Sequence, residues 1–309
     1  MKKNGLLILG LTAIIGNVSA QLPSQGISSS GVLDGIYVQE HIPTKKVIPY
    51  VPLREADVIW SKRVWRTIDL KEKINHPLYY PERPISDRMA LWDVIKWAAL
   101  DEKSITLYDL NGLDFDDQFR YPVKPPGGNY NNEDYKEKMN NYFYFVETVD
   151  SLDENDDPVY DAVTGDPLTK KMLIPIEAKN IVKYEVKEDW FFDKQRSVLD
   201  VRIIGISPVI YRTNPVTGDI MGSQNLFWVY FPECRYVFQN FFVYNTKNDA
   251  MRMSFDDLFW KRMFGSYVHK ETNVFDRGIN PTWTGIDALL ESERVKEDIF
   301  RFEHDLWHL

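Results

Sequence analysis

The segment from Asp57 to Leu70 carries a clear pattern of apolar and charged positions. Wound as an α-helix, it gathers its apolar side chains on one face, namely Val58, Trp60, Val64, Trp65 and Ile68. The other face then holds Lys62, Arg63, Arg66 and Asp69. As a strand the segment fails to alternate, because Trp65 falls opposite Trp60. The pattern therefore predicts a helix whose tryptophans anchor it to the core.

Three further segments have helical spacing. Residues 86–101 begin at the capping residue Ser86 and are apolar over more than half of the helix circumference, so we expect cover on two sides. Residues 254–267 open with a capping box of Ser254 and Asp257. Residues 285–309 repeat apolar positions at helical intervals, at Val295, Ile299, Phe302 and Leu306. This last helix either docks on its own domain or faces a neighbour.

Runs of β-branched and aromatic residues at strand length lie between Tyr142 and Tyr244. They are residues 142–150, 158–163, 168–176, 180–193, 198–206 and 225–231. Two similar turns, VTGDPL at 163–168 and VTGDIM at 216–221, place Gly165 and Gly218 where a hairpin requires positive φ. Strands flanked by helices predict an α+β fold. We expect a central, mostly antiparallel sheet with helices from the N-terminal and C-terminal thirds packed on it.

The start of the chain differs from the rest. Residues 1–20 combine a basic start, a short apolar run and a small-residue end, which predicts a secretory signal peptide cleaved after Ala20. The apolar run is too short to span a bilayer, so no direct membrane insertion is expected. Residues 21–55 are rich in Ser, Gly and Pro and read as an extended arm, either a tail or a strap along a neighbouring subunit. Residues 56–309 are expected to form a single α+β domain.

Charge and cysteine content narrow the class of protein. The chain has 37 Lys and Arg against 46 Asp and Glu, and cleavage after Ala20 would remove Lys2 and Lys3. This acidic balance argues against nucleic-acid binding. The single cysteine, Cys234, cannot form an internal disulfide, so stability must come from an apolar core. We expect Cys234 to be a buried thiol, the alternative being an intermolecular disulfide.

Candidate catalytic and metal-binding patterns are sparse. His304 and His308 are four residues apart, a spacing that can hold a metal, but no third ligand is evident. The acidic runs DLNGLDFDDQ and DSLDENDD lack the register of a calcium loop. Motifs for a nucleophilic serine or cysteine, and glycine loops for phosphates, are not found. We therefore predict no catalytic residue, no cofactor and no metal.

Five long, aromatic-rich segments resemble one known family in the same order along the chain. They are DVIWSKRVWRTIDLKEKINHPLYYP, RIIGISPVIYR, FWVYFPECRYV, SFDDLFWKRMFGSYVHKE and ALLESERVKEDIFRFEHDLWHL. The family is GldN/PorN, components of gliding motility and type IX secretion in Gram-negative bacteria. The resemblance runs from about Ala56 to Leu309. No catalytic residues are carried over from it.

The resemblance implies a non-enzymatic structural subunit in the periplasm. Such proteins bind an outer-membrane lipoprotein of the GldK/PorK type, form a large ring with it, and meet the periplasmic region of a GldM/PorM-type shaft. Peripheral association with the outer membrane would then come from the lipoprotein. Two other functions stay open from the residues alone: a secreted glycan-binding module using exposed aromatics, and an exported hydrolase with an unrecognised carboxylate pair.

Partner contacts are expected from two kinds of residue. A basic strip on the predicted 57–70 helix would face an acidic surface of a neighbour, through Lys62, Arg63 and Arg66. Aromatic side chains in the C-terminal third supply anchors, because such residues dominate interface energetics. These candidates are Trp260, Phe264, Tyr267 and Trp307.

Overall fold

The computed structural model describes most of the chain after the first 45 residues. The described ranges are 46–85, 88–110, 117–150, 169–213, 218–245, 248 and 250–305. All of them fall in one compact unit, Pro43–Leu309. The predicted signal peptide and most of the predicted arm lie outside the described residues.

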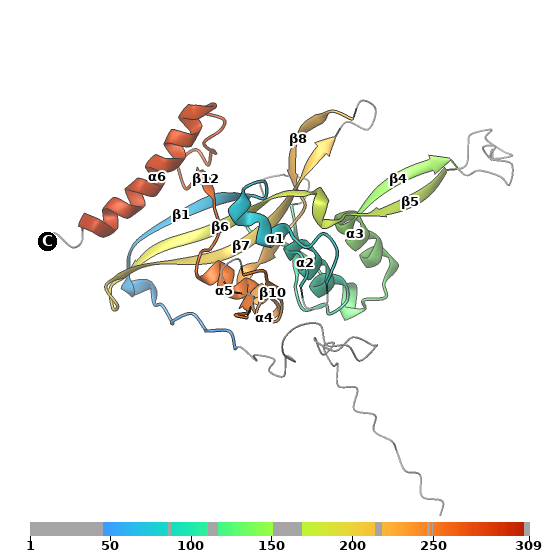
Figure 1. The fold of residues 1–309 in the computed structure, drawn as a ribbon, viewed down its shortest axis with the longest axis horizontal. Coiled ribbons are helices and arrows are strands. Elements are labelled where there is room, and N and C mark those ends of the chain that lie inside the picture. Colours follow the sequence, from blue (N-terminus) through green and yellow to red (C-terminus); the bar gives the residue numbers. More distant parts are fainter. Residues whose placement is uncertain are drawn as a thin grey trace, which may run out of the picture. The chain divides into compact units, whose positions relative to one another are not determined.

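An eight-stranded sheet forms the centre of this unit, in the order β12-β1-β6-β7-β9-β2-β3, with β8 paired to β7 (Figure 1). Its strands are β1 (Val58–Asp69), β2 (Leu107–Asp109), β3 (Tyr121–Val123), β6 (Ile181–Asp193), β7 (Val198–Thr213), β8 (Ile220–Asn225), β9 (Trp228–Tyr230) and β12 (Tyr267–Glu271). Each neighbouring pair is antiparallel. The predicted α+β class with a mostly antiparallel sheet is confirmed.

The described residues form six α-helices, which contribute side chains to two cores against this sheet. They are α1 (His76–Tyr79), α2 (Leu91–Leu100), α3 (Glu133–Phe143), α4 (Phe231–Phe238), α5 (Phe255–Trp260) and α6 (Ile286–Asp305). The main core joins α2, α4 and α5 to β6 and β7, and its large buried members include Trp92, Phe227 and Phe259. A smaller core lies under α6, where Val295 and Ile299 meet β1 and β12.

Two small sheets stand apart from the main one. β10 (Phe242–Val243) pairs with β11 (Met253–Ser254), next to α5. β4 (Tyr144–Asp150) pairs with β5 (Thr169–Pro175) along seven residue pairs, and in the described chain neither strand joins another sheet. A short 3₁₀ turn, η4 (Ala178–Asn180), separates β5 from β6. The polypeptide thus leaves the β4–β5 hairpin and enters the main sheet within six residues.

The predicted helix at 57–70 is wrong, because this segment is the long strand β1. It pairs with β6 on one side and with β12 on the other. Its central residues Val64–Ile68 are buried one after another, since both faces of the sheet are covered here. A strand buried on both faces loses the apolar–polar alternation on which the prediction relied.

The other predicted helices are found with changed lengths. The second begins at Leu91 rather than at Ser86, which lies outside the described residues. Ser254 and Asp257 form the predicted capping box, but α5 ends at Trp260, and Tyr267 belongs to β12. The last helix follows its predicted spacing as α6.

Three helices in the described ranges were not predicted: α1, α3 and α4. Of these, α4 follows β9 directly and begins at Phe231, the last residue of the run 225–231 that was predicted as a strand. Its proline, Pro232, sits in the first turn, where a missing N–H costs nothing. The turn prediction at Gly218 is confirmed, since this residue has φ +73° in the β7–β8 hairpin. The run at 158–163 and the turn at Gly165 lie outside the described residues.

Candidate interaction surfaces

The three basic residues predicted to form one strip are divided by the strand geometry of β1. Successive side chains of a strand point to opposite faces, so Arg63 lies on one face and Lys62 and Arg66 on the other. Each also has a carboxylate partner within the chain. Lys62 Nζ lies 2.7 Å from Glu271, and Arg63 Nη2 lies 2.7 Å from Asp189, the residue opposite it on β6. To bind an acidic surface of a neighbour, Lys62 and Arg63 would therefore have to share or exchange the ion pairs that they form within the chain.

Arg66 belongs to a buried charge cluster around Glu188, which has no exposed surface. The Glu188 carboxylate accepts hydrogen bonds from Arg66 Nε at 3.0 Å, Arg262 Nη2 at 2.9 Å and Trp190 Nε1 at 3.1 Å. Burial lowers the pKa of Arg66 from its ordinary value, and the Glu188 charge opposes this shift. Because one carboxylate serves two guanidiniums, the cluster ties β1, β6 and the segment after α5 together.

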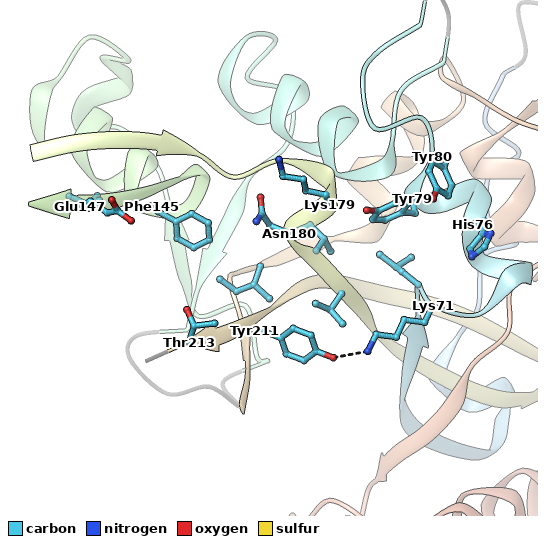
Figure 2. A pocket seen from close by; sticks show the side chains of 15 residues that line it. Lys71, His76, Tyr79, Tyr80, Phe145, Glu147, Lys179, Asn180, Tyr211 and Thr213 are labelled. Carbon is cyan, nitrogen blue, oxygen red and sulfur yellow. Dashed lines mark hydrogen bonds between the residues drawn. The ribbon is translucent and has the colours of Figure 1, made fainter. Parts of the chain in front are cut away.

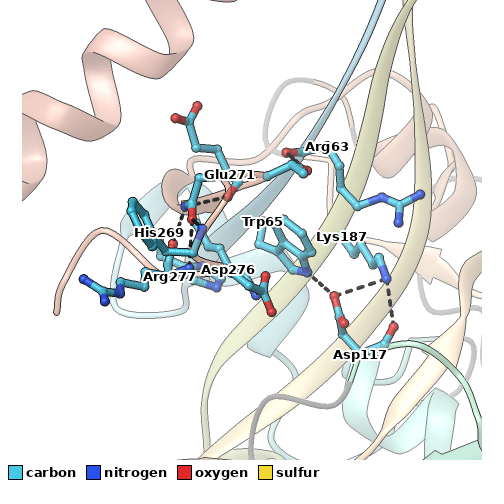
Figure 3. Close-up of polar contacts among 12 residues, drawn as sticks. Arg63, Trp65, Asp117, Lys187, His269, Glu271, Asp276 and Arg277 are labelled. Atoms are coloured by element: carbon cyan, nitrogen blue, oxygen red, sulfur yellow. Dashed lines mark hydrogen bonds and ion pairs between the residues drawn. The ribbon is translucent and has the colours of Figure 1, made fainter. Parts of the chain in front are cut away.

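A second polar cluster lies on the opposite face of β1, around Asp117 (Figure 3). Its carboxylate lies 3.1 Å from Lys187 Nζ and accepts a hydrogen bond from Trp65 Nε1 at 2.5 Å. Lys187 also donates to the Asp117 carbonyl at 2.8 Å. Burial lowers the pKa of Lys187, while the charge of Asp117 raises it. These contacts fasten the loop before β3 to the sheet.

The edge strand β12 is held by further polar contacts. The Thr67 hydroxyl lies 2.8 Å from Nδ1 of His269, and Val268 N donates to the hydroxyl of Ser292 on α6 at 2.8 Å. Burial lowers the pKa of His269. Within the described ranges, no group of three or more His, Cys, Asp or Glu side chains has the arrangement of a metal site. The polar contacts of this strand hold β12 and its neighbouring strands together.

The predicted aromatic anchors occupy different environments. Trp260, at the end of α5, is 46% exposed and stacks on Tyr50 with ring centroids 5.6 Å apart. Phe264 is buried in the main core against Phe259, and Tyr267 is half-buried on β12. Trp307 lies outside the described residues. The structure brings Trp260 together with the end of the predicted arm, and it places Phe264 in the protein interior.

Tyr50 attaches the last residues of the predicted arm to the folded body. The guanidinium of Arg235 lies 4.6 Å from the Tyr50 ring and 4.8 Å from the Trp260 ring, and it is ion-paired to Asp256 at 2.8 Å. The Arg202 guanidinium also lies over the Tyr50 ring, 5.0 Å from its centroid, and it donates a hydrogen bond to the Val51 carbonyl at 2.5 Å. Residues 46–54 therefore follow their own domain before the 3₁₀ turn η1 (Glu55–Asp57) and β1.

A groove with a volume of about 850 Å³ opens between the β4–β5 hairpin and the end of β7 (Figure 2). β6 begins opposite Ile210, whereas β7 continues to Thr213, so the last residues of β7 have no β6 neighbour. The walls carry Tyr79 at the end of α1 and Tyr80 directly after it, Phe145 from β4 and Tyr211 from β7. Lys71 Nζ donates to the Tyr211 hydroxyl at 3.1 Å. An aromatic groove beside a strand edge with which no described strand pairs has the chemistry that receives an extended peptide.

The hairpin itself exposes apolar side chains on both of its faces. Val146 and Leu173 form one cross-strand pair, and Phe145 and Met172 occupy the neighbouring positions with the opposite orientation. All four are exposed. Sequence reasoning predicted both strands but missed this exposure, because an alternating strand gives no sign of whether a second layer covers it.

The fold and these surfaces define a class: an α+β scaffold whose central strands carry internally paired charge clusters and whose described strands and helices expose apolar side chains. A family profile described as "Gliding motility associated protein GldN" matches residues 53–308. The chain belongs to this family, and it is thereby a component of the gliding machinery of the cell envelope. A search of curated proteins finds no match.

Two predictions made from the sequence are confirmed: the family resemblance and the buried thiol. The matched range agrees with the resemblance that begins near Ala56. Cys234 is free and fully buried, as expected for an inert thiol, and burial raises its pKa far above the ordinary value. No helix in the described part of the chain has both the length and the apolar character needed to cross a bilayer.

Proposed function

We propose that this chain is a non-enzymatic structural subunit of the type IX secretion and gliding machinery. It is exported, loses residues 1–20, and works in the periplasm as the folded domain 56–309. It forms a ring with an outer-membrane lipoprotein of the GldK/PorK type, which holds it at the outer membrane. It also contacts the periplasmic region of a GldM/PorM-type shaft.

The observation that carries this proposal is the uncovered β4–β5 hairpin. An isolated two-stranded hairpin is at best marginally stable in water, and stability requires a further strand or a covering layer. Here Val146, Leu173 and Met172 are all exposed on ordered strands. Exposed apolar edges are also sites of unwanted association unless a partner covers them. We assign the partner lipoprotein to this hairpin, in agreement with family membership in a multi-protein machine.

Co-expression of the chain with its candidate lipoprotein tests the proposal. Size-exclusion chromatography and electron microscopy should show a large ring-shaped assembly that contains both proteins. The double variant Val146→Asp/Leu173→Lys should lose co-purification while its circular dichroism spectrum and unfolding midpoint stay close to wild type, because the two new side chains form an opposite-charge cross-strand pair. Ile59→Asp is the matched control, because Ile59 is equally apolar and exposed but lies on β1.

Two results would count against this function. If the purified protein stays monomeric in the presence of the lipoprotein at micromolar concentration, the proposed ring is contradicted. If the hairpin variant and the control co-purify equally well, the hairpin is not the lipoprotein contact, and the proposal of a ring still stands.

A further inference from the structure

Helix α6 carries a second apolar stripe that its own domain does not use. The buried stripe faces β12 and β1 through Ser292, Val295 and Ile299. At 100° per residue, Ile286 and Leu290 fall opposite this stripe, Leu289 and Phe300 lie on the flank roughly 90–110° from its centre, and all four are exposed. A helix that is apolar on two sides is normally buried on two sides. The first turns of α6 therefore lack one of their covering surfaces.

The residues leading into α6 extend this surface in an ordered way. Trp283 is exposed immediately before the helix, and its N–H donates to the Ile279 carbonyl at 2.9 Å. In the preceding loop, Asn273 accepts hydrogen bonds from two backbone N–H groups and donates to the Arg277 carbonyl at 2.7 Å. We name the exposed surface of Trp283, Ile286, Leu289 and Leu290 the α6 stripe. A preordered apolar surface loses little conformational entropy on binding, as good interface anchors do.

An apolar groove of about 790 Å³ lies elsewhere on the same domain, between α1 and β10. Its floor and walls include Phe242, Tyr80, Ile85 and Tyr244, and the last three are exposed. The Arg88 guanidinium lies 5.9 Å from the Tyr244 ring, and a backbone bridge joins Arg88 to Phe242, so the two sides of the groove are connected. This groove is separate from the one at the β4–β5 hairpin, although both use Tyr80 and His76.

Charge distinguishes the possible occupants of the groove. Helix α6 carries seven carboxylates, at Asp287, Glu291, Glu293, Glu297, Asp298, Glu303 and Asp305, against three bases, Arg294, Lys296 and Arg301. The groove lining carries three bases, Lys73, Arg83 and Arg88, against the single carboxylate of Glu82. Two α6 helices facing each other would bring net negative surfaces together, whereas α6 over the groove brings opposite charges together.

We propose that the α6 stripe of one copy docks in the α1–β10 groove of a second copy. The contact joins two different surfaces, so it is heterologous, and repetition of such a contact closes a ring or extends a filament. This inference rests on the proposed function for its biological setting, because it supplies the contact between neighbouring copies in the ring. It is independent of the lipoprotein contact assigned to the β4–β5 hairpin.

Site-specific cross-linking tests the two surfaces directly. Cys234 is fully buried, so an engineered surface cysteine is the reactive thiol among the described residues. Leu290→Cys and Ile85→Cys are prepared as separate proteins, mixed, and treated with a short bis-maleimide, with and without the lipoprotein. The mixture should give a dimer that contains one chain of each variant, and neither variant alone should give it. Leu290→Cys mixed with Ile220→Cys is the matched control, since Ile220 is exposed on β8.

Sedimentation velocity supplies the quantitative arm. Leu290→Asp should weaken self-association roughly tenfold or more, because it removes an apolar anchor of the proposed contact and puts in its place a carboxylate that must lose its hydration on docking. Arg83→Glu should weaken it and reduce its dependence on salt. If two Leu290→Cys chains cross-link to each other as readily as a Leu290→Cys chain cross-links to an Ile85→Cys chain, the inference is overturned in favour of α6–α6 pairing. A ring that still assembles with Leu290→Asp at wild-type yield also overturns it and leaves the proposed function standing, whereas loss of all assembly by the wild-type chain overturns both.

Discussion

Two neighbouring carboxylates on β6 allow a direct measurement of how burial changes the contribution of an ion pair to the free energy of unfolding. Glu188 and Asp189 point to opposite faces of the sheet, and each accepts from a base on β1. The side chains of Arg66 and Glu188 are 9% and 0% exposed, and those of Arg63 and Asp189 are 43% and 29% exposed. We therefore compare Glu188→Gln with Asp189→Asn, which are equal changes at adjacent positions.

The expected difference follows from what each substitution leaves behind. Glu188→Gln removes the carboxylate shared by Arg66 and Arg262 and turns an amide NH₂ toward their N–H donors. Removing one partner of a buried pair costs about 3–5 kcal/mol of unfolding free energy. Asp189→Asn removes a solvent-screened pair, for which about 0.2–1 kcal/mol is typical. We expect the first variant to be less stable than the second by roughly 3 kcal/mol.

Urea unfolding followed by tryptophan fluorescence measures both variants against the wild-type chain. Trp190 donates to Glu188 and lies in the cluster, so its emission also reports on the local structure. The difference should persist in 0.5 M NaCl for Glu188→Gln and shrink for Asp189→Asn, because buried pairs are screened less than exposed ones. Equal destabilisation of the two variants would refute the reasoning.

Three further predictions concern the arm, a helix cap and pH. Tyr50→Ala should lower the free energy of unfolding by about 1–2 kcal/mol through loss of the Arg235 and Trp260 contacts, with exposed Ile48→Ala near zero in the same urea titration. Ser254→Ala should cost about 1 kcal/mol in thermal unfolding, because the N-cap of α5 is lost. The pKa of His269 is lower in the folded than in the unfolded chain, so its contribution is complete above the ordinary histidine value and is lost as pH falls below it. Urea midpoints from pH 7.5 to 5 should therefore drop less in His269→Asn than in wild type.

The sequence predicted elements well where a single face is buried. In α6 the interval between Val295 and Ile299 identifies a helix with one core face, and the Ser254–Asp257 box marks the start of α5. It failed at β1, where cover on both faces removes the alternation that separates strand from helix. It failed again at α4, which was not predicted and whose first residue, Phe231, ends an aromatic run with strand propensity.

The interaction surfaces could not be predicted from the sequence for a different reason. Lys62, Arg63 and Arg66 look like a free basic strip because their partners lie more than 120 residues away in sequence. Which apolar side chains stay exposed, such as Leu290 on α6 or Met172 on β5, depends on layers assembled from distant segments. Periodicity gives the faces of an element, and only the tertiary structure shows which face is left uncovered.

The long central strands have a mechanical consequence for a subunit of a moving machine. β6 spans 13 residues and pairs antiparallel with β1 on one side and with the 16-residue β7 on the other, with backbone hydrogen bonds perpendicular to the strands. A pull directed along these strands loads many bonds in shear at the same moment, whereas a pull across them opens the bonds one after another. The domain is therefore stiffest along the axis of β6, and traction along that axis is the direction in which it can transmit force without unfolding.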